Sequence, residues 1–188
     1  RHNQTLGLPD RLMPFTPFHM GPAMVIKAVA THRFSLLVFG ASQLLMDVEP
    51  LIRIIRGDPI LHGFTHTYVG ATLIGAIAAL VARPASNWLL RACRRNPRSP
   101  LLTWLCEPGL LSWGVAVASA FLGTYSHVLL DSIMHADMRP WAPMIDTNDL
   151  LGVISTSQLY LWCVASGLLG LVLLAVAFVL RKAISGER

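Results

Sequence analysis

Residues 150–180 read LLGVISTSQLYLWCVASGLLGLVLLAVAFVL, a run without Asp, Glu, Lys or Arg. Shorter uncharged runs occupy 59–82 and 108–130. A helix crosses a bilayer with about 20 apolar residues, so runs of this length are typical of membrane spans. Buried helices of a soluble bundle are the alternative, and the longest run argues against it. The spans that we predict are 63–83, 110–135 and 157–180.

The composition of the whole chain points the same way. Its 188 residues favour a single domain. Charged residues make up only 13%, about half the share usual in soluble domains, while hydrophobic residues make up 54%. Such a chain is too apolar to be disordered, and its three scattered cysteines exclude a disulfide scaffold. Despite the net charge of +5, nucleic-acid binding is not expected.

The N-terminal region allows two arrangements. One is a single long span at 25–46, and the other is a pair of short helices, 15–31 and 34–51, joined by a Thr-His-Arg turn. We favour the pair, because Thr16 followed by Pro17 is typical of a helix start. Each helix is short for a full crossing, which implies local thinning or tilted neighbours. The predicted fold is an all-α, polytopic membrane helical bundle of about five helices, two short N-terminal ones and three longer ones.

Basic residues in short loops mark the cytoplasmic side of a membrane protein. The 84–109 segment is rich in arginine and the 136–156 segment in aspartate. We therefore expect the first segment and the 184–188 tail to be cytoplasmic, and 136–156 and 52–62 to face outside. The arginines of the cytoplasmic segment are Arg91, Arg94, Arg95 and Arg98, and those of the outer loop, expected to contact head groups, are Arg53 and Arg56.

A single membrane-embedded domain is expected at 13–183. Residues 1–12 are polar and precede Met13, which resembles a natural start, so we expect them to be an extension or a remnant. No short apolar core is followed by a small-residue cleavage site, and no cleavable signal peptide is therefore expected.

Ionisable side chains that lipid disfavours gather at the outward end of the predicted bundle. They are His19, Asp47, Glu49, His62, His66, His127, Asp131 and His135. With the topology above they all reach the outer leaflet, the first of them only if the first segment crosses. This convergence is the main functional signal in the sequence, because ionisable groups inside membranes are functional candidates by default.

The spacing of these residues sharpens the signal. His62 and His66 are i and i+4, so we expect both rings on one helix face. His127, Asp131 and His135 follow at i, i+4 and i+8, again on one face of a helix. A charge at the centre of a membrane helix costs ~2.5–3.5 kcal/mol, so Asp131 is not expected to be a mere packing residue.

Imidazoles and carboxylates at such spacing are the ligands that Zn²⁺ and similar transition ions take. One ion takes about three or four protein ligands, so eight candidates suffice for two ions. They also suffice for one ion with a base and orienting partners. Asp47 and Glu49, two residues apart, suit a helix end or a turn. The residues thus predict a site for a divalent metal, zinc or a similar ion, with one or two ions.

Four motifs follow one another along the chain: MPFTPFH at 13–19, MDVEP at 46–50, HGFTHT at 62–67 and SHVLLD at 126–131. Over residues 13–180 this order resembles the YdjM-like bacterial inner-membrane, metal-dependent hydrolases. The chain departs from the family pattern in having Met46 for a proline, Glu49 for a second aspartate and Thr67 for a serine. The last two changes keep a ligand-capable oxygen and a hydroxyl.

The resemblance implies a metal-dependent hydrolase of a bacterial inner membrane. From the basic and acidic segments described above, we expect its site to face outside and its C-terminus to be cytoplasmic. A remote similarity of that family to zinc-dependent phospholipase C implies phosphoester chemistry. The expected metal ligands are His19, Asp47, His66, His127 and Asp131. The residues expected to serve as base, proton donor or orienting partner are His62, Glu49 and His135.

A site at the outer leaflet would admit a lipid or a lipid-linked substrate laterally from the membrane. Arg139 and Asp137 are expected to bind the substrate, Arg139 because a guanidinium holds a phosphate by a forked contact. Trp141, between Pro140 and Pro143, predicts an interfacial loop over the site. The expected partners are therefore membrane lipids.

Two other functional classes stay open. A metal or proton transporter also places His and Asp inside a bundle, but its polar residues would continue to the inner face, which reads here as Ala, Leu, Val and Gly. A non-catalytic protein with a structural metal site would hold the ion with no open coordination position. Small residues such as Gly75 and Gly123 fit close helix packing or a homo-oligomer, and they do not discriminate between the classes.

Overall fold

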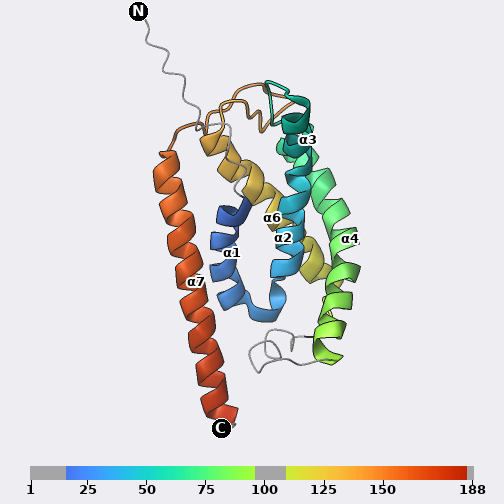
Figure 1. The fold of residues 1–188 in the computed structure, drawn as a ribbon, viewed down its shortest axis with the longest axis vertical. Coiled ribbons are helices and arrows are strands. Elements are labelled where there is room, and N and C mark those ends of the chain that lie inside the picture. Colours follow the sequence, from blue (N-terminus) through green and yellow to red (C-terminus); the bar gives the residue numbers. More distant parts are fainter. Residues whose placement is uncertain (1–15, 96–108, 186–188) are drawn as a thin grey trace, which may run out of the picture.

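The computed structural model describes residues 16–95 and 109–185. The regular elements in these residues are helices, and there is no strand among them. Its two short N-terminal helices and three longer ones confirm the predicted all-α bundle (Figure 1). The short helices are α1 (Thr16–Ala30) and α2 (Leu36–Met46), and the longer ones are α4 (Tyr68–Arg95), α6 (Trp113–Met134) and α7 (Thr156–Ser185). The three longer helices are long and apolar enough to cross a membrane.

The first two helices form an antiparallel hairpin, as the favoured arrangement of the N-terminal region required (Figure 1). A 3₁₀ turn, η1 (Thr31–Arg33), joins them. The Lys27 ammonium closes this turn by donating to the carbonyl oxygens of Thr31 and Phe34, at 2.6 and 2.9 Å. The 15 residues of α1 span about 22 Å at 1.5 Å per residue, less than the ~30 Å of a hydrocarbon core.

The prediction of the second helix, 34–51, is wrong at its C-terminal end. It breaks at Asp47 and resumes as α3 (Val48–Arg56), so residues expected in the 52–62 loop are helical. Pro50 explains the break, because it has no N–H to donate to the carbonyl of Met46, four residues earlier. The Thr65 hydroxyl oxygen lies 3.3 Å from that carbonyl.

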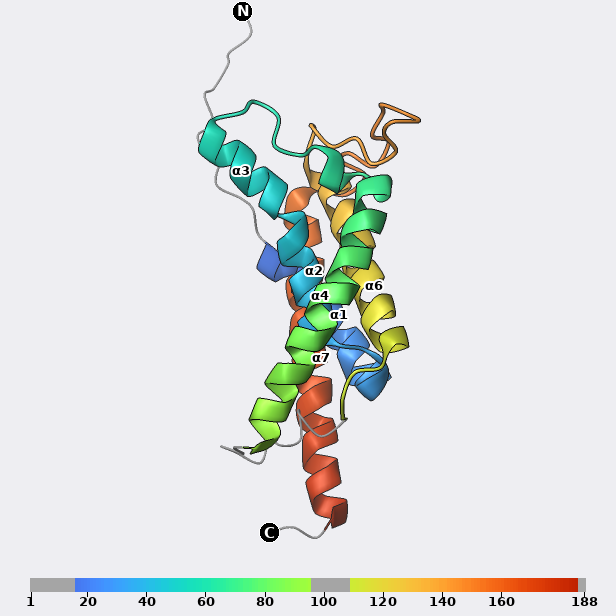
Figure 2. The same ribbon diagram turned by 90° about the vertical axis from the view of Figure 1, so that its right-hand side faces the viewer.

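A glycine ends α3. Gly57 has φ +75°, in the left-handed region that glycine adopts without strain, and its N–H caps the helix at the carbonyls of Arg53 and Ile54. The helix leans outward from the bundle at the end where the loop that follows α6 also lies (Figure 2). The chain then returns to the bundle through residues 58–67.

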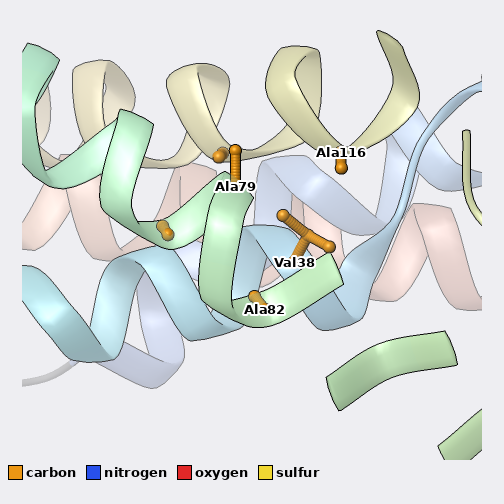
Figure 3. Close-up of a cluster of buried hydrophobic side chains, with 6 residues drawn as sticks. Val38, Ala79, Ala82 and Ala116 are labelled. Atoms are coloured by element: carbon orange, nitrogen blue, oxygen red, sulfur yellow. The ribbon is translucent and has the colours of Figure 1, made fainter. Parts of the chain in front are cut away.

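Small residues let the central helices approach closely. α2, α4 and α6 pack against one another, while α1 packs against α7 and α2. The core between the first three is built from Val38, Ala78, Ala79, Ala82, Ala116 and Ala120 (Figure 3). On α6, the buried stripe of alanine, serine and glycine leads at helical spacing to His127 and Asp131. The stripe therefore fixes which face of α6 those two side chains occupy.

The α4 helix runs past its predicted end at residue 83. The arginines at 91, 94 and 95 lie on this helix and not in a loop, which corrects the predicted 84–109 loop. Contacts with the start of α6 hold the extension. The Arg83 guanidinium donates to the Leu111 carbonyl at 3.0 Å and lies 4.2 Å from the Trp113 ring centroid, and Asn87 accepts from the Leu111 N–H at 2.7 Å.

Some expectations fall outside the described residues, namely those for residues 1–12, Met13, Arg98 and the last three residues of the tail.

Cys93 is disulfide-bonded, whereas Cys163 is free and buried. A disulfide is typical of an oxidising compartment, while the arginines nearby favour the cytoplasm. The side of the membrane on which this end of α4 lies stays a prediction.

Candidate metal centre

Five separate segments bring ionisable side chains to one end of the bundle, the upper end in Figure 1. The segments are the first turn of α1, the α2–α3 break, residues 62–66 with the turn η2 (Phe64–His66), the last turns of α6 and the loop after it. The side chains that could hold a metal ion are His19, Asp47, His62, His66, His127, Asp131, His135 and Asp137. The structure thus brings together seven of the eight predicted residues and adds Asp137.

His127 lies at the centre of the inner group. Its Nε2 atom is 3.1 Å from an Asp131 carboxylate oxygen, 3.3 Å from an Asp47 oxygen and 3.2 Å from Nε2 of His66. Three of these four side chains are buried, and Asp47 is partly exposed. We call His127, Asp131, Asp47 and His66 the inner cluster.

His19 lies on the far side of Asp131. Its Nε2 atom is 3.4 Å from the second carboxylate oxygen of Asp131, and its Nδ1 is 3.4 Å from Nδ1 of His127. The side chain is buried. The Asp131 carboxylate therefore joins the inner cluster to a further histidine, and the first turn of α1 contributes to the site.

The predicted helix that would carry His62 and His66 is wrong. His62 lies in an irregular segment and His66 in η2, because α4 begins only at Tyr68. Thr67 starts that helix: its hydroxyl accepts from the Gly70 N–H at 2.9 Å, as an N-cap residue does. The two rings still meet, with centroids 4.8 Å apart. His135 likewise follows the end of α6 rather than lying on its face.

His62, His135 and Asp137 form a second, half-buried group, which we call the mouth cluster. The ring centroids of His62 and His135 are 4.4 Å apart. One Asp137 oxygen lies 2.8 Å from Nδ1 of His62, and the other accepts the backbone N–H groups of Leu61 and His62 at 2.9 and 3.1 Å. Burial alone would raise the pKa of Asp137, but these bonds hold it well below its usual range.

Glu49 stands behind the inner cluster and not in it. One carboxylate oxygen accepts from the Arg53 guanidinium at 2.7 and 3.0 Å, and the other from the N–H and hydroxyl of Thr65 at 2.8 and 2.7 Å. Burial opposes ionisation of this carboxyl, yet these bonds bring its pKa below the ordinary value. Glu49 therefore anchors the turn that carries His66.

Hydrogen bonds on the outer side of two rings test whether the inner cluster suits a metal ion. The Thr65 hydroxyl donates to Glu49 and so can only accept from Nδ1 of His66, 3.0 Å away. The side-chain oxygen of Gln43 accepts from Nδ1 of His127. In the neutral rings both Nε2 atoms then carry lone pairs, which face each other and two carboxylates.

Such a set of acceptors repels itself unless a cation lies among them. The spacing also fits: ligands about 2.0–2.1 Å from a tetrahedral zinc ion are about 3.3 Å apart, and the contacts of His127 Nε2 range from 3.1 to 3.3 Å. The residues of the inner cluster therefore could hold a divalent metal ion of this kind.

The expected substrate residues lie in the loop after α6. Arg139 is exposed and donates to the Asp146 carbonyl at 2.6 Å, within its own loop. The Pro140 carbonyl accepts from the Tyr68 N–H at 2.9 Å, and the Trp141 ring lies 4.7 Å from the Tyr68 ring. These contacts hold the loop against the start of α4, beside the mouth cluster. The Asp137 carboxylate contacts His62 and therefore belongs to the mouth cluster.

Sequence reasoning missed Gln43 and Thr65, which contact two of the predicted ligands. A signal for Gln43 was present: it is the one amide in the apolar stretch of α2 and lies four residues before Asp47, on the same helix face. Thr65 had no comparable signal, because its partner Glu49 is reached only through the fold of the 58–67 segment.

Comparison with known proteins finds no matching family model, no similar curated protein and no similar solved structure. The geometry of the site therefore carries the functional argument, and the resemblance noted in the sequence stays an expectation.

Asp137→Asn is expected to destabilise the protein by about 1.5–3 kcal/mol at neutral pH, since it removes a charged acceptor. Because the pKa of Asp137 is depressed, the stabilisation is present above its usual value of 3.8 and is lost as the pH falls below it. Unfolding of variant and wild type at pH 7 and pH 3 measures this. Asp149→Asn, at an exposed carboxylate, is the control, and equal losses from both variants at pH 7 would contradict the assignment.

Proposed function

We propose that the protein is a membrane-embedded, metal-dependent hydrolase that acts on a lipid or lipid-linked phosphoester. The observation that carries this proposal is the inner cluster: two unprotonated imidazole nitrogens and two carboxylates converge within metal-ligand spacing. The mouth cluster beside it adds further histidines that no structural site would need. When bound, a zinc-like ion would activate water and polarise the scissile ester.

The residues of the two clusters would have different roles in such a site. His66, His127, Asp47 and Asp131 would hold the ion, with His19 on the far side of Asp131. His62 is the best candidate for the base. Its Nδ1 donates to Asp137, so its Nε2 is free to accept a proton. His135, stacked on His62, can share or return that proton.

The surface around the site favours a lipid substrate. Large apolar side chains are exposed on both segments that flank it. On α3 and the segment that follows it, they include Leu51, Ile55 and Ile60. On the loop after α6, they include Trp141, Met144, Ile145 and Val153. Both segments extend from the same end of the bundle (Figure 2). An amphipathic helix and an exposed tryptophan are typical of the membrane interface. A lipid ester could reach the mouth cluster from that depth.

The buried interior argues against a transport pathway. The buried ionisable side chains of the described residues lie at the site end: His19, His66, His127 and Asp131. Beneath them, the hydrophobic cluster shared by α2, α4 and α6 is alanine and valine (Figure 3), and the buried polar side chains beside it, such as Ser42, Ser119 and Thr124, are uncharged. A proton or metal pathway needs ionisable groups that continue across the membrane. We further propose that the site faces the outside of a bacterial inner membrane.

Hydrolysis assays in lipid nanodiscs test the proposal. Wild-type protein loaded with Zn²⁺ is expected to release head groups or phosphate from phospholipids or lipid phosphates, and a chelator is expected to stop the release. His62→Ala is expected to lower the rate while the bound metal is retained. Absence of turnover on every phosphoester lipid, in protein that has bound its metal, would refute the hydrolase and favour a structural metal site.

A further inference from the structure

We infer that Gln43 is a positioning residue that sets the tautomer of His127 and thereby the metal affinity of the inner cluster. The inference rests on the proposed metal site but not on the reaction that the site catalyses. Gln43 is fully buried, in the last turns of α2, and faces α6. Asn148, another amide near the site, contacts the candidate ligand His135 only at its backbone carbonyl, at 3.4 Å.

Contacts with α6 fix the orientation of the Gln43 amide. Its nitrogen donates to the Gly123 carbonyl at 3.1 Å and approaches the Ser126 hydroxyl at 3.5 Å. A carbonyl oxygen can only accept, so the amide nitrogen must be the atom that faces Gly123. The amide oxygen is consequently the atom that meets Nδ1 of His127.

The tautomer of His127 follows from this orientation. An amide oxygen has no proton to give, so Nδ1 of His127 carries the hydrogen, and in the neutral ring Nε2 is left with a lone pair. That lone pair faces Asp47, Asp131 and His66. Without Gln43, the two carboxylates would favour a proton on Nε2, and a metal ion would have to displace it.

Close helix packing makes the contact with Gln43 available. A side chain at Gly123 would collide with the Ser42 hydroxyl, so only glycine lets α2 approach α6 this closely. Ser42, next to Gln43, is equally buried but donates only to Phe39 within its own helix, at 2.7 Å. Ser42→Ala is therefore a matched control that removes a buried hydrogen bond without touching His127.

The test compares zinc affinity by chelator competition in Gln43→Leu, Gln43→Glu and Ser42→Ala proteins. Gln43→Leu is expected to bind zinc 10–100-fold more weakly, the usual effect of losing a partner that orients a metal-bound histidine. Gln43→Glu is expected to stay near wild type, because a carboxyl oxygen also accepts from Nδ1. Ser42→Ala is expected to leave the affinity unchanged.

A second readout needs no variant. Nitrogen-15 NMR of histidine-labelled, metal-free wild type is expected to show His127 protonated at Nδ1, and Gln43→Leu is expected to move the proton to Nε2. A wild-type His127 that carries a proton on Nε2 and none on Nδ1 would overturn the inference, even if Gln43→Leu failed to fold. So would unaltered zinc affinity in a folded Gln43→Leu. If wild type and Ser42→Ala both bind no zinc, the proposed metal site itself fails.

Discussion

Replacing His127 and Asp131 together by alanine is expected to abolish metal binding and, with it, hydrolysis. These two residues make most of the contacts of the inner cluster, and both are buried. Without them, two ligands of the inner cluster remain, Asp47 and His66. Elemental analysis of detergent-purified protein should find about one or two zinc ions per wild-type chain and none in the variant.

The matched control for this experiment exchanges the same residue types where they are exposed. His32 lies in the turn between α1 and α2, and Asp149 lies in the loop after α6. The double variant His32→Ala/Asp149→Ala is expected to keep its metal. An equal metal content in all three proteins would place the ion elsewhere and refute the inner cluster as its site.

Removing the metal from the wild type is expected to lower its melting temperature by several degrees. An ion that binds only the folded chain, at a free concentration a thousand times its dissociation constant, contributes ~4 kcal/mol. Thermal unfolding with and without a chelator measures this difference. The His127→Ala/Asp131→Ala variant is the control, because a chelator should leave its melting temperature unchanged. A wild type that is equally insensitive would contradict the prediction.

The stability of the metal-free protein is also expected to depend on pH. Burial lowers the pKa of His66 below its ordinary value of 6.5, because the interior disfavours the imidazolium, so the folded chain holds this ring neutral. The unfolded chain takes up the proton once the pH falls below 6.5. Stability from His66 is therefore full above pH 6.5 and is lost as the pH falls further toward the lowered value. The melting temperature of the wild type measured in chelator should therefore fall between pH 7 and pH 5.

Local sequence was sufficient for most of the fold. The uncharged runs predicted the three long helices, and the Thr-His-Arg turn with its flanking apolar stretches predicted the N-terminal hairpin. The prediction failed where a single residue, or a contact with a distant segment, determines where a helix ends. Pro50 breaks the second helix one turn early, and contacts of Arg83 and Asn87 with the start of α6 carry α4 beyond its predicted end.

The candidate site was predictable in its membership but not in its geometry. Alternating helices return the chain to the same end of a bundle, so His19, Asp47, His66 and His127 could be assigned to one end from topology alone. The i, i+4 spacing was correct for His127 and Asp131, which share a face of α6. It misled for His62 and His66, whose rings meet through an irregular turn held by Glu49.

The sequence by itself determined which segments leave water and become helices, because apolarity and helical hydrogen bonding act over neighbouring residues. Only the tertiary structure decided which atoms face one another at the site. His19 and His127 are 108 positions apart, and Gln43 and His127 are 84 apart. The close approach of α2 to α6 at Gly123 brings Gln43 to His127, and packing of that kind depends on shape across the whole bundle rather than on any local pattern.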